Sequence, residues 1–297
     1  MIPSYLERLL EDIKTIAILT RELGLELYSV YVGGGTPSIL TAEQIKRLLS
    51  CVNENFDMSS CREFTFEAGR PDTVTLEKLA TLKSFGVGRI SLNTQTANDD
   101  VLRVVGRKHT FLDYLEKLNI ARNVGFDSIN TDLIAGLPTE SYESFCESLD
   151  KVIGTGVENI TVHSLTLKKS SELKTLGEFE LLGEGIKVRN MLDYAQRKLK
   201  CENYLPYYIY RQKNTVGNLE NTGYSKVGKE CLYNILMMEE FHTVFSAGAG
   251  AVTKLVSPDR KTIERLFEQK YPYEYLSKED KRLDTEAVRR FYSEYFS

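Results

Sequence analysis

Polar residues and glycines occur at or near the ends of five apolar, β-branched runs in the first two-thirds of the sequence. In chain order they are Gly33, Gly34, Gly35 and Thr36, then Glu67, Gln95, Asp132 and the stretch 164–166. Taken singly, each has an ordinary explanation, such as a helix cap, a satisfied loop or a pair with a neighbouring strand. Ligands of parallel α/β folds bind at the carboxyl ends of the strands, so the joint placement predicts one shared ligand site.

The triple glycine in YVGGGTPS, residues 31–38, raises the question of what its backbone freedom is for. Either the turn is only tight, or a ligand approaches the backbone too closely for a Cβ atom. A phosphate-binding P-loop is not indicated, because no Gly-Lys-Ser or Gly-Lys-Thr follows. Hydrolysis through a serine nucleophile has no support either, since the sequence contains no Gly-x-Ser-x-Gly.

Neither the histidines nor the cysteines are spaced like metal ligands. No pair among His109, His163 and His242 has zinc-like spacing. We expect His109 to orient the nearby Arg107 or simply to pack, and His163 to lie in the core of a strand. The five cysteines are odd in number and widely spaced, which predicts reduced, mostly buried thiols rather than disulfides. No metal ligands are predicted in this chain.

Composition argues against several classes of partner. The 297 residues carry a formal net charge of −4, which gives no electrostatic case for binding nucleic acid or acidic membranes. No apolar run reaches the length of about 18 residues that spans a bilayer, and the N-terminus lacks a secretory signal pattern. We therefore expect a soluble, cytoplasmic protein with no nucleic-acid or membrane partner.

Strand-like and helix-like segments alternate over the first 200 residues. A capping box beginning at Thr41, and glycines closing two helical segments, mark helix boundaries. A first helix is predicted from Pro3 to Leu23, with no strand before it. This alternation predicts an α/β fold with a parallel sheet. The predicted strands are 25–32, 63–68, 89–95, 128–137 and 159–167.

The pattern changes after about residue 200, where we place a domain boundary. Residues 203–230 are dense in Tyr, Asn and Gly and show little helical period. Residues 231–255 are predicted to form two strands around a turn. The charged, aromatic tail from residue 261 to residue 297 is predicted to be helical.

Several of these segments together resemble a known family. The motifs GGGTPS, EAGRPD, RISLNTQ, GRKHT and DLIAGLP, in this order, are similar to those of one class of radical S-adenosylmethionine (radical SAM) enzymes. That class is the oxygen-independent coproporphyrinogen III oxidases, also called coproporphyrinogen dehydrogenases, and the resemblance extends from about residue 4 to residue 255. It implies a partial (β/α) TIM-like barrel over residues 1–200, lacking the first strand. It also implies a smaller α+β C-terminal domain over residues 201–297 that covers the substrate.

The resemblance implies roles for individual residues in binding S-adenosylmethionine. Arg107 would bind the methionyl carboxylate, while Gln95 and Asp132 would hydrogen-bond the ribose hydroxyls. The glycine-rich strand end would let the backbone approach the methionyl amine. Thr166 and Val252 would meet the adenine or a second S-adenosylmethionine. The full predicted cofactor-binding set is Gly33, Gly34, Gly35, Thr36, Glu67, Gln95, Arg107, Asp132, Thr166 and Val252.

YYIYRQKN, residues 207–214, is the predicted substrate-recognition segment. A tetrapyrrole with four carboxylates needs cations at its rim and a flat apolar surface beneath the ring. Tyrosine rings and basic side chains supply both, unless the segment is only an aromatic surface strand with solvated basic residues. The predicted substrate residues are Tyr207, Tyr208, Tyr210, Arg211 and Lys213.

The chain departs from the family at its defining element. In that family a CxxxCxxC loop after the first barrel strand holds three irons of a 4Fe-4S cluster, and this chain has no such spacing. We expect the cluster ligands upstream of this chain, which is then a fragment or the product of a late start codon rather than a natural clusterless relative. Without a first strand, residues 25–32 would become an unpaired edge prone to association.

In intact form the expected activity is oxygen-independent oxidative decarboxylation of coproporphyrinogen III to protoporphyrinogen IX in haem biosynthesis, with an unidentified electron donor or acceptor. This chain alone is expected to be inactive, because it lacks the cluster cysteines. Two alternatives stay open. One is a haem- or tetrapyrrole-binding protein without turnover, and the other is a clusterless S-adenosylmethionine-binding module.

Overall fold

The computed structural model describes residues 1–297 except 167–177, 212–214, 216–218, 278–282 and 297. Within that part the chain packs into two compact units. Unit 1 comprises residues 1–30, 40–63 and 232–297, and unit 2 comprises residues 31–39 and 64–231. The units are defined by packing and do not test the domain boundary predicted near residue 200, which stays a prediction.

Seven strands form one sheet in the order β1, β2, β3, β4, β5, β7, β6. Strands β2 to β5 pair in parallel, and β7 pairs antiparallel with both β5 and β6. The predicted α/β fold with a parallel sheet is therefore confirmed. The bounds are β1 Ser29–Val32, β2 Glu63–Gly69, β3 Arg89–Leu92, β4 Ser128–Ala135, β5 Asn159–Ser164, β6 Leu205–Tyr210 and β7 Asn221–Ser225.

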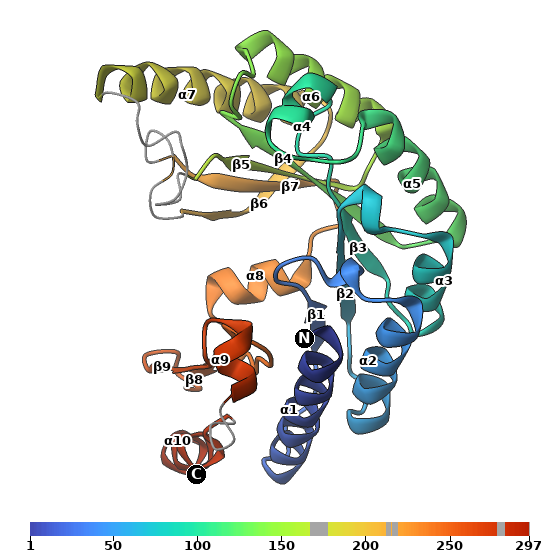
Figure 1. The fold of residues 1–297 in the computed structure, drawn as a ribbon. Coiled ribbons are helices and arrows are strands. Elements are labelled where there is room, and N and C mark those ends of the chain that lie inside the picture. Colours follow the sequence, from blue (N-terminus) through green and yellow to red (C-terminus); the bar gives the residue numbers. More distant parts are fainter. Residues whose placement is uncertain (167–177, 212–214, 216–218, 278–282, 297) are drawn as a thin grey trace. The chain divides into compact units, whose positions relative to one another are not determined.

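The helices of unit 2 cover one face of its strands (Figure 1). In β4 the odd-numbered residues, such as Thr131 and Leu133, are buried on the helix side, whereas Asn130 and Asp132 stay half-buried on the other face. The face without helices is therefore the polar one. The helices are α3 Leu76–Ser84, α4 Asp99–Val104, α5 Phe111–Val124, α6 Tyr142–Thr155 and α7 Glu178–Cys201, with short 3-10 helices at Pro37–Ile39 and Pro71–Thr73.

Local signals fix where these helices begin and end. Thr110 and Asp113 form a reciprocal capping box at the start of α5, and Gly125 ends that helix with a left-handed φ of 87°. Ser141 caps α6 by accepting from Ser144 N at 3.1 Å. The end of α5 leads the chain into β4, and the start of α6 follows β4. Each helix therefore returns the chain to the same edge of the sheet, and consecutive strands run in the same direction.

Unit 1 combines residues from both ends of the chain. Leu19 of its first helix packs against Leu255, Val288 and Phe291 in one buried cluster. The predicted first helix and the capping box at Thr41 are both confirmed. The helices of unit 1 are α1 Ile2–Glu22, α2 Ala42–Asn55, α8 Leu232–Glu239, α9 Pro272–Ser277 and α10 Thr285–Tyr295, and its hairpin strands are β8 Val252–Val256 and β9 Ile263–Phe267.

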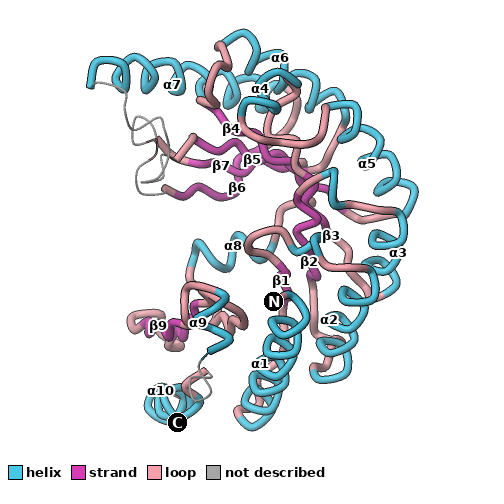
Figure 2. The backbone as a smooth tube through the Cα atoms, in the orientation of Figure 1, coloured by secondary structure: helices cyan, strands magenta, loops and turns pink. Residues whose placement is uncertain are grey.

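The prediction of two strands over residues 231–255 is wrong for the first of them. This stretch opens with α8, which Figure 2 shows as a helix. The Glu63 carboxylate accepts from the backbone N–H groups of Leu232 and Tyr233, at 2.9 and 3.1 Å, and so satisfies the helix N-terminus. Leu and Met are also strong helix formers. A short apolar run, however, cannot be assigned to a helix or a strand from its periodicity alone.

The prediction of a helical tail from residue 261 is also wrong at its start. Residues 263–267 form β9, which pairs antiparallel with β8 from Val252↔Phe267 to Val256↔Ile263. The turn between the strands is held by Ser257, whose N–H donates to Thr262 O at 3.0 Å. The apolar residues of this segment, Ile263, Leu266 and Phe267, do not alternate, so the pairing with β8 rather than a local pattern makes it a strand. The rest of the tail contains the predicted helical segments α9 and α10.

Strand β1 lies at one end of the sheet order and is an edge strand, as predicted. It is shorter than the predicted 25–32, since only Ser29–Val32 has strand geometry, and all four of its residues are half-buried. An edge strand leaves one row of backbone donors and acceptors unpaired by the sheet.

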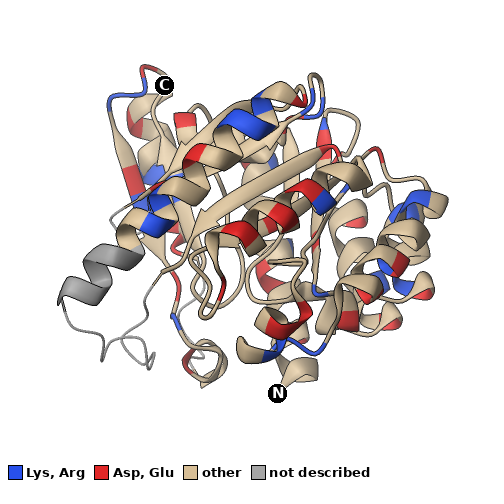
Figure 3. Cartoon of the chain, turned by 90° about the horizontal axis from the view of Figure 1, so that it is seen from above, with Lys and Arg blue, Asp and Glu red and all other residues tan. Residues whose placement is uncertain are grey.

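The surfaces of the helices carry charges of both signs. Figure 3 shows Lys and Arg interspersed with Asp and Glu along them. Among the helices that the structure describes, none combines the length and the apolar character needed to cross a bilayer.

Candidate functional site

The triple glycine follows β1 directly and serves both packing and backbone geometry. A Cβ atom on Gly33 would come within 2.4 Å of Cε1 of Tyr31 and 2.9 Å of Oε1 of Glu67, so no larger residue fits there. Gly34 and Gly35 have φ angles of 78° and 61°, in the left-handed region. Within the described part of the chain, no atom lies within 4 Å of a Cβ position on Gly34 or Gly35. These two glycines therefore border open space.

Glu67, near the end of β2, is tied to the glycine loop. Its Oε1 accepts from the Tyr31 hydroxyl at 2.5 Å, and its Oε2 accepts from Gly34 N at 3.2 Å. Burial raises the pKa of Glu67, and the hydrogen bond from Tyr31 opposes that shift. The carboxylate thus holds the end of β1 and the glycine loop against β2.

Asp132 is the centre of a set of side chains that extends from β3 to β6. Its Oδ2 accepts from Asn93 Nδ2 at 2.7 Å, and its Oδ1 accepts from Asn130 Nδ2 at 2.8 Å. His163 Nε2 lies 3.6 Å from the same Oδ2, and the Tyr210 hydroxyl lies 3.1 Å from His163 Nδ1. We call these five residues the polar belt.

The polar belt and Glu67 share one electrostatic environment. Burial raises the pKa of Tyr210 to about 12, and the negative charges of Asp132 and Glu67 add to that shift. The charge of Asp132 also raises the pKa of Glu67, while His163 lowers it. Glu67 of β2, Asp132 of β4 and His163 of β5 therefore influence one another's charge.

Gln95 lies just beyond β3 in an unusual backbone conformation. Its φ is 73°, and its backbone bridges to β4 by donating to Asp132 O and accepting from Ile134 N, both at 3.0 Å. A non-glycine residue in this region carries strain that the surrounding structure has to hold. Its side-chain amide forms no hydrogen bond with any residue the structure describes. The amide is therefore available to a ligand.

Arg107 lies in the loop between α4 and α5 and is half-buried. Its guanidinium forms no hydrogen bond or ion pair within the described residues. Burial and the like charge of Arg70 lower the pKa of Arg107, and the carboxylates of Asp72 and Asp132 oppose that shift. A partly desolvated guanidinium without a partner is suited to bind the carboxylate of a ligand.

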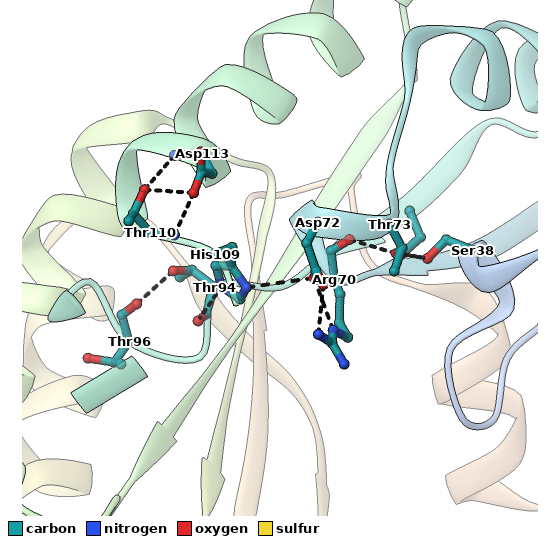
Figure 4. A network of polar contacts seen from close by, with 10 residues as sticks. Ser38, Arg70, Asp72, Thr73, Thr94, Thr96, His109, Thr110 and Asp113 are labelled. Carbon is teal, nitrogen blue, oxygen red and sulfur yellow. Dashed lines mark hydrogen bonds and ion pairs between the residues drawn. The ribbon is translucent and has the colours of Figure 1, made fainter. Parts of the chain in front are cut away.

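A network joins the loop after β2 to the loop that carries Arg107 (Figure 4). Arg70 donates to both carboxylate oxygens of Asp72, at 3.0 and 2.7 Å. Oδ1 of Asp72 lies 4.0 Å from Nδ1 of His109, whose Nε2 lies 3.4 Å from Thr94 O. Burial lowers the pKa of His109, which is only 3% exposed. His109 thus packs between the two loops and fixes the segment that carries Arg107.

Tyr208 and Tyr210 of β6 lie side by side, with ring centroids 6.1 Å apart and 7° between the ring planes. We call this pair the tyrosine platform. The Tyr208 ring crosses β7 over Gly223, where a Cβ atom would come within 1.8 Å of it, and its hydroxyl lies 3.3 Å from Thr161 Oγ1 on β5. Tyr207 packs edge-on against Tyr208 at 4.8 Å. The platform is therefore continuous with the polar belt.

Of the two basic residues in the predicted substrate segment, the structure describes Arg211. Arg211 forms an ion pair with Glu220, with Nη2 2.7 Å from Oε1, and both side chains are exposed. A pair this exposed is weak, so Arg211 can exchange its partner for a ligand carboxylate. Lys213 lies outside the described residues.

Three further predicted cofactor residues lie in different places. Thr36 precedes the first 3-10 helix, and its side chain lies near Gly69 of β2. Thr166 pairs with Thr215 in an isolated bridge beyond β5. Val252 begins β8 in unit 1, so the geometry of unit 2 does not test its predicted role. The cofactor roles assigned to all the predicted residues stay predictions.

Sequence reasoning missed several residues of this site. His163 was expected in the core, but its side chain is 25% exposed and faces Asp132. A signal was present, because polar residues alternate with apolar ones in three consecutive strands and so mark one face. The missed residues are Tyr31, Asn93, Asn130 and His163.

The two cofactors implied by the resemblance fit this chain differently. S-adenosylmethionine fits, because the Arg107 guanidinium and the Gln95 amide lack partners in the described part and Gly34 and Gly35 border open space. A 4Fe-4S cluster does not fit. The described residues contain no group of three His, Cys, Asp or Glu placed to hold a metal ion, and all five cysteines are free and dispersed.

Comparison with known sequences finds a matching family model and related proteins with two kinds of name. The family model described as the Radical SAM superfamily matches residues 2–152. A Bacillus subtilis protein named oxygen-independent coproporphyrinogen-III oxidase-like protein HemZ is 39% identical over 274 residues, which are 92% of this chain and 54% of that protein. The heme chaperone HemW of Bacillus subtilis is 31% identical over 84% of this chain and 64% of its own length. The chain thus spans between half and two-thirds of these relatives.

Comparison with solved structures supports the fold. Coproporphyrinogen III oxidase (HemN) from Escherichia coli, described as a radical SAM enzyme, matches 94% of this chain and 63% of its own chain. The TM-score is 0.70 at 22% sequence identity, so the match confirms the predicted partial barrel. Since the family model covers more than half of the sequence, the chain belongs to the radical SAM superfamily.

Proposed function

We propose that this chain carries the cofactor- and substrate-binding surfaces of an oxygen-independent coproporphyrinogen III oxidase, which forms protoporphyrinogen IX in haem biosynthesis. The observation that carries the proposal is the half-buried guanidinium of Arg107, without a partner in the described part and within electrostatic range of Asp132. A cation within electrostatic range of a diol acceptor suits a ligand with a carboxylate at one end and a ribose at the other. S-adenosylmethionine is such a ligand.

Each residue in this proposal contacts one part of S-adenosylmethionine. Arg107 donates to the methionyl carboxylate, and the carbonyl oxygens at Gly34 and Gly35 accept from the methionyl amine. Gln95 and Asp132 hydrogen-bond the ribose hydroxyls. When bound, S-adenosylmethionine supplies the hydrogen-abstraction chemistry of the superfamily, and the protein contributes binding, orientation and exclusion of water.

The tyrosine platform supplies the flat surface for the tetrapyrrole. Its rings lie beside His163 and Asp132, so a bound macrocycle would border the proposed ribose site. Arg211 provides a cation for a peripheral carboxylate, in exchange for its exposed partner Glu220. The electron donor or acceptor that the reaction needs is an unidentified partner. We also propose a cytoplasmic location, which the five free cysteines support.

Turnover by the native, cluster-loaded protein tests the oxidase proposal. The substrate would be coproporphyrinogen III carrying deuterium on the propionate side chains, under anaerobic conditions. We expect deuterium in 5′-deoxyadenosine and release of two molecules of CO₂ per substrate. Tetrapyrrole binding without transfer of the label would reject the oxidase.

The second candidate is a haem- or tetrapyrrole-binding protein without turnover. The 31% identity to heme chaperone HemW over 84% of this chain favours it. Titration with haemin would then show a shifted Soret band that saturates at one equivalent, and no decarboxylation.

The third candidate is a clusterless S-adenosylmethionine-binding module. The unpartnered Arg107 guanidinium favours it as well, because that group needs no cluster to bind a carboxylate. Calorimetry with this chain separates the candidates. Strong S-adenosylmethionine binding without a cluster supports the module, and weak binding supports the oxidase, which would need its cluster for tight binding.

A further inference from the structure

His163 contacts both surfaces that the proposed function uses. Its Nε2 lies 3.6 Å from Oδ2 of Asp132, on the proposed ribose side. Its Nδ1 lies 3.1 Å from the hydroxyl of Tyr210, on the tetrapyrrole side. The exposed fractions are 25% for the His163 side chain and 21% for that of Asp132, so water only partly screens this contact.

The neighbours of the imidazole restrict how it is protonated. With the proton on Nε2, the ring points a donor at the Asp132 carboxylate and accepts from the Tyr210 hydroxyl at Nδ1. The other neutral tautomer would turn a lone pair toward the carboxylate, which is unfavourable. The protonated ring donates at both nitrogens. In both of these states Nδ1 contacts the Tyr210 hydroxyl. The position of that hydroxyl therefore sets the orientation of the ring and the direction in which Nε2 donates.

Asp132 depends on few donors for its orientation. Asn93 and Asn130 each donate to one carboxylate oxygen, and both amides belong to the parallel part of the sheet. His163 faces the same oxygen as Asn93, and through Tyr210 it connects that oxygen to β6. Glu67 is the other carboxylate that faces this group, and its own bonds go to Tyr31 and Gly34.

We propose that His163 is a positioning residue that couples the tyrosine platform to Asp132, so that a tetrapyrrole on the platform strengthens binding of a ribose at Asp132. A flat ligand on the rings restricts Tyr210, a restricted Tyr210 holds His163, and His163 fixes the acceptor Oδ2. The first ligand then loses the conformational entropy of ordering Tyr210, His163 and Asp132, and the second ligand does not lose it again. Binding of the two ligands is therefore cooperative. This inference rests on the proposed function, because it assumes that both surfaces bind the ligands named there.

The test measures adenosine binding by NMR titration of this chain, with and without saturating coproporphyrin III. Adenosine carries the ribose but has no methionyl group, so it needs no cluster. We expect coproporphyrin III to tighten adenosine binding roughly fivefold, at the lower end of typical couplings between sites. With 2′-deoxyadenosine, which lacks one hydroxyl of the 2′,3′-diol, the tightening should be smaller.

Variants of Tyr210 and His163 test separately the contact of the imidazole with Tyr210 and its contact with Asp132. Tyr210→Phe removes only the hydroxyl and keeps the ring of the platform, so coproporphyrin III should still bind but should no longer tighten adenosine binding. His163→Gln retains a donor near the position of Nε2 and should lose the coupling, because it has no group at the position of Nδ1. His163→Asn retains a polar group only near Nδ1, so it should lose the coupling and also bind adenosine more weakly than His163→Gln. Tyr142→Phe, which removes a hydroxyl on α6, is the matched control and should couple like the wild type.

The outcomes distinguish this inference from the proposal beneath it. If the wild-type chain binds neither probe, the proposed binding surfaces fail and the inference falls with them. If both probes bind independently, or if Tyr210→Phe couples like the wild type, the inference alone is wrong. Circular dichroism and thermal unfolding of each variant establish that it is folded. If the His163 variants do not fold, Tyr210→Phe alone still tests the inference.

Discussion

At the scale of single residues, Gly33 sets how tightly the end of β1 packs on β2. Replacing Gly33 with Ala would bring a methyl group against Tyr31 and Glu67, whose hydrogen bond is 2.5 Å long. We expect this overpacking to lower the free energy of unfolding by about 1–3 kcal/mol. Gly35→Ala meets no atom of the described chain and should cost only its left-handed backbone strain, about 1 kcal/mol. Urea unfolding of both variants measures the difference, and equal costs would show that packing at Gly33 is not limiting.

Buried Glu140 makes the stability of the fold depend on pH. It is 1% exposed, its Oε1 accepts from Thr96 Oγ1 at 2.5 Å, and its Oε2 has no hydrogen-bond partner among the described residues. Burial raises the pKa of Glu140 from 4.5 to about 7. The folded state therefore holds the proton more tightly than the unfolded chain. This stabilisation is full below pH 4.5 and is lost as the pH rises through about 7.

Glu140→Gln should remove this pH dependence, because the amide still accepts from Thr96 but does not titrate. From pH 5 to pH 8 the wild type should lose up to about 3 kcal/mol more unfolding free energy than the variant. Urea titrations at the two pH values measure this. Glu143→Gln, at an exposed position of α6, is the control and should follow the wild type. Parallel behaviour of wild type and Glu140→Gln would contradict the assignment.

At the scale of elements, β7 determines whether the tyrosine platform forms. A Cβ atom on Gly223 would come within 1.8 Å of the Tyr208 ring, so Gly223→Ala must displace that ring from its place across β7. We expect coproporphyrin III to bind at least tenfold more weakly, as measured by fluorescence quenching. Gly154→Ala, in α6, has open space and a good helix position, and it should leave binding unchanged. Unchanged affinity in Gly223→Ala would show that the platform is not the tetrapyrrole surface.

The elements also show which parts of the fold can be predicted from the sequence. The strands of the parallel sheet were predictable because their β-branched runs and the helix caps are local signals. Helix α8 was not, since the carboxylate of Glu63 that satisfies its N-terminus is 169 residues away from Leu232. The polar belt was half-predictable. Asp132 stood out as a polar residue inside an apolar run, but its link to Tyr210 runs through His163 and depends on the antiparallel strands β6 and β7, which the sequence did not indicate.

At the scale of the whole molecule, edge strand β1 is expected to promote self-association of this chain. Sedimentation velocity should show species larger than a monomer as the concentration rises. Val30→Lys places a charge on the edge and should shift the distribution toward monomer. Val104→Lys, at a position of α4 that is 56% exposed, adds the same charge elsewhere and should not. A monodisperse, thermally stable wild-type monomer at high concentration would contradict this prediction.

The central claim is that the polar face of this sheet binds S-adenosylmethionine, with Arg107 on the methionyl carboxylate. The most direct measurement compares S-adenosylmethionine and adenosine binding to wild type, Arg107→Gln and the neighbouring, exposed control Lys108→Gln. Only S-adenosylmethionine has the carboxylate, so Arg107→Gln should weaken its binding about tenfold and leave adenosine binding unchanged, a loss of roughly 1.4 kcal/mol. Lys108→Gln should bind both ligands like the wild type. Equal effects of Arg107→Gln on the two ligands, or no effect on either, would contradict the account.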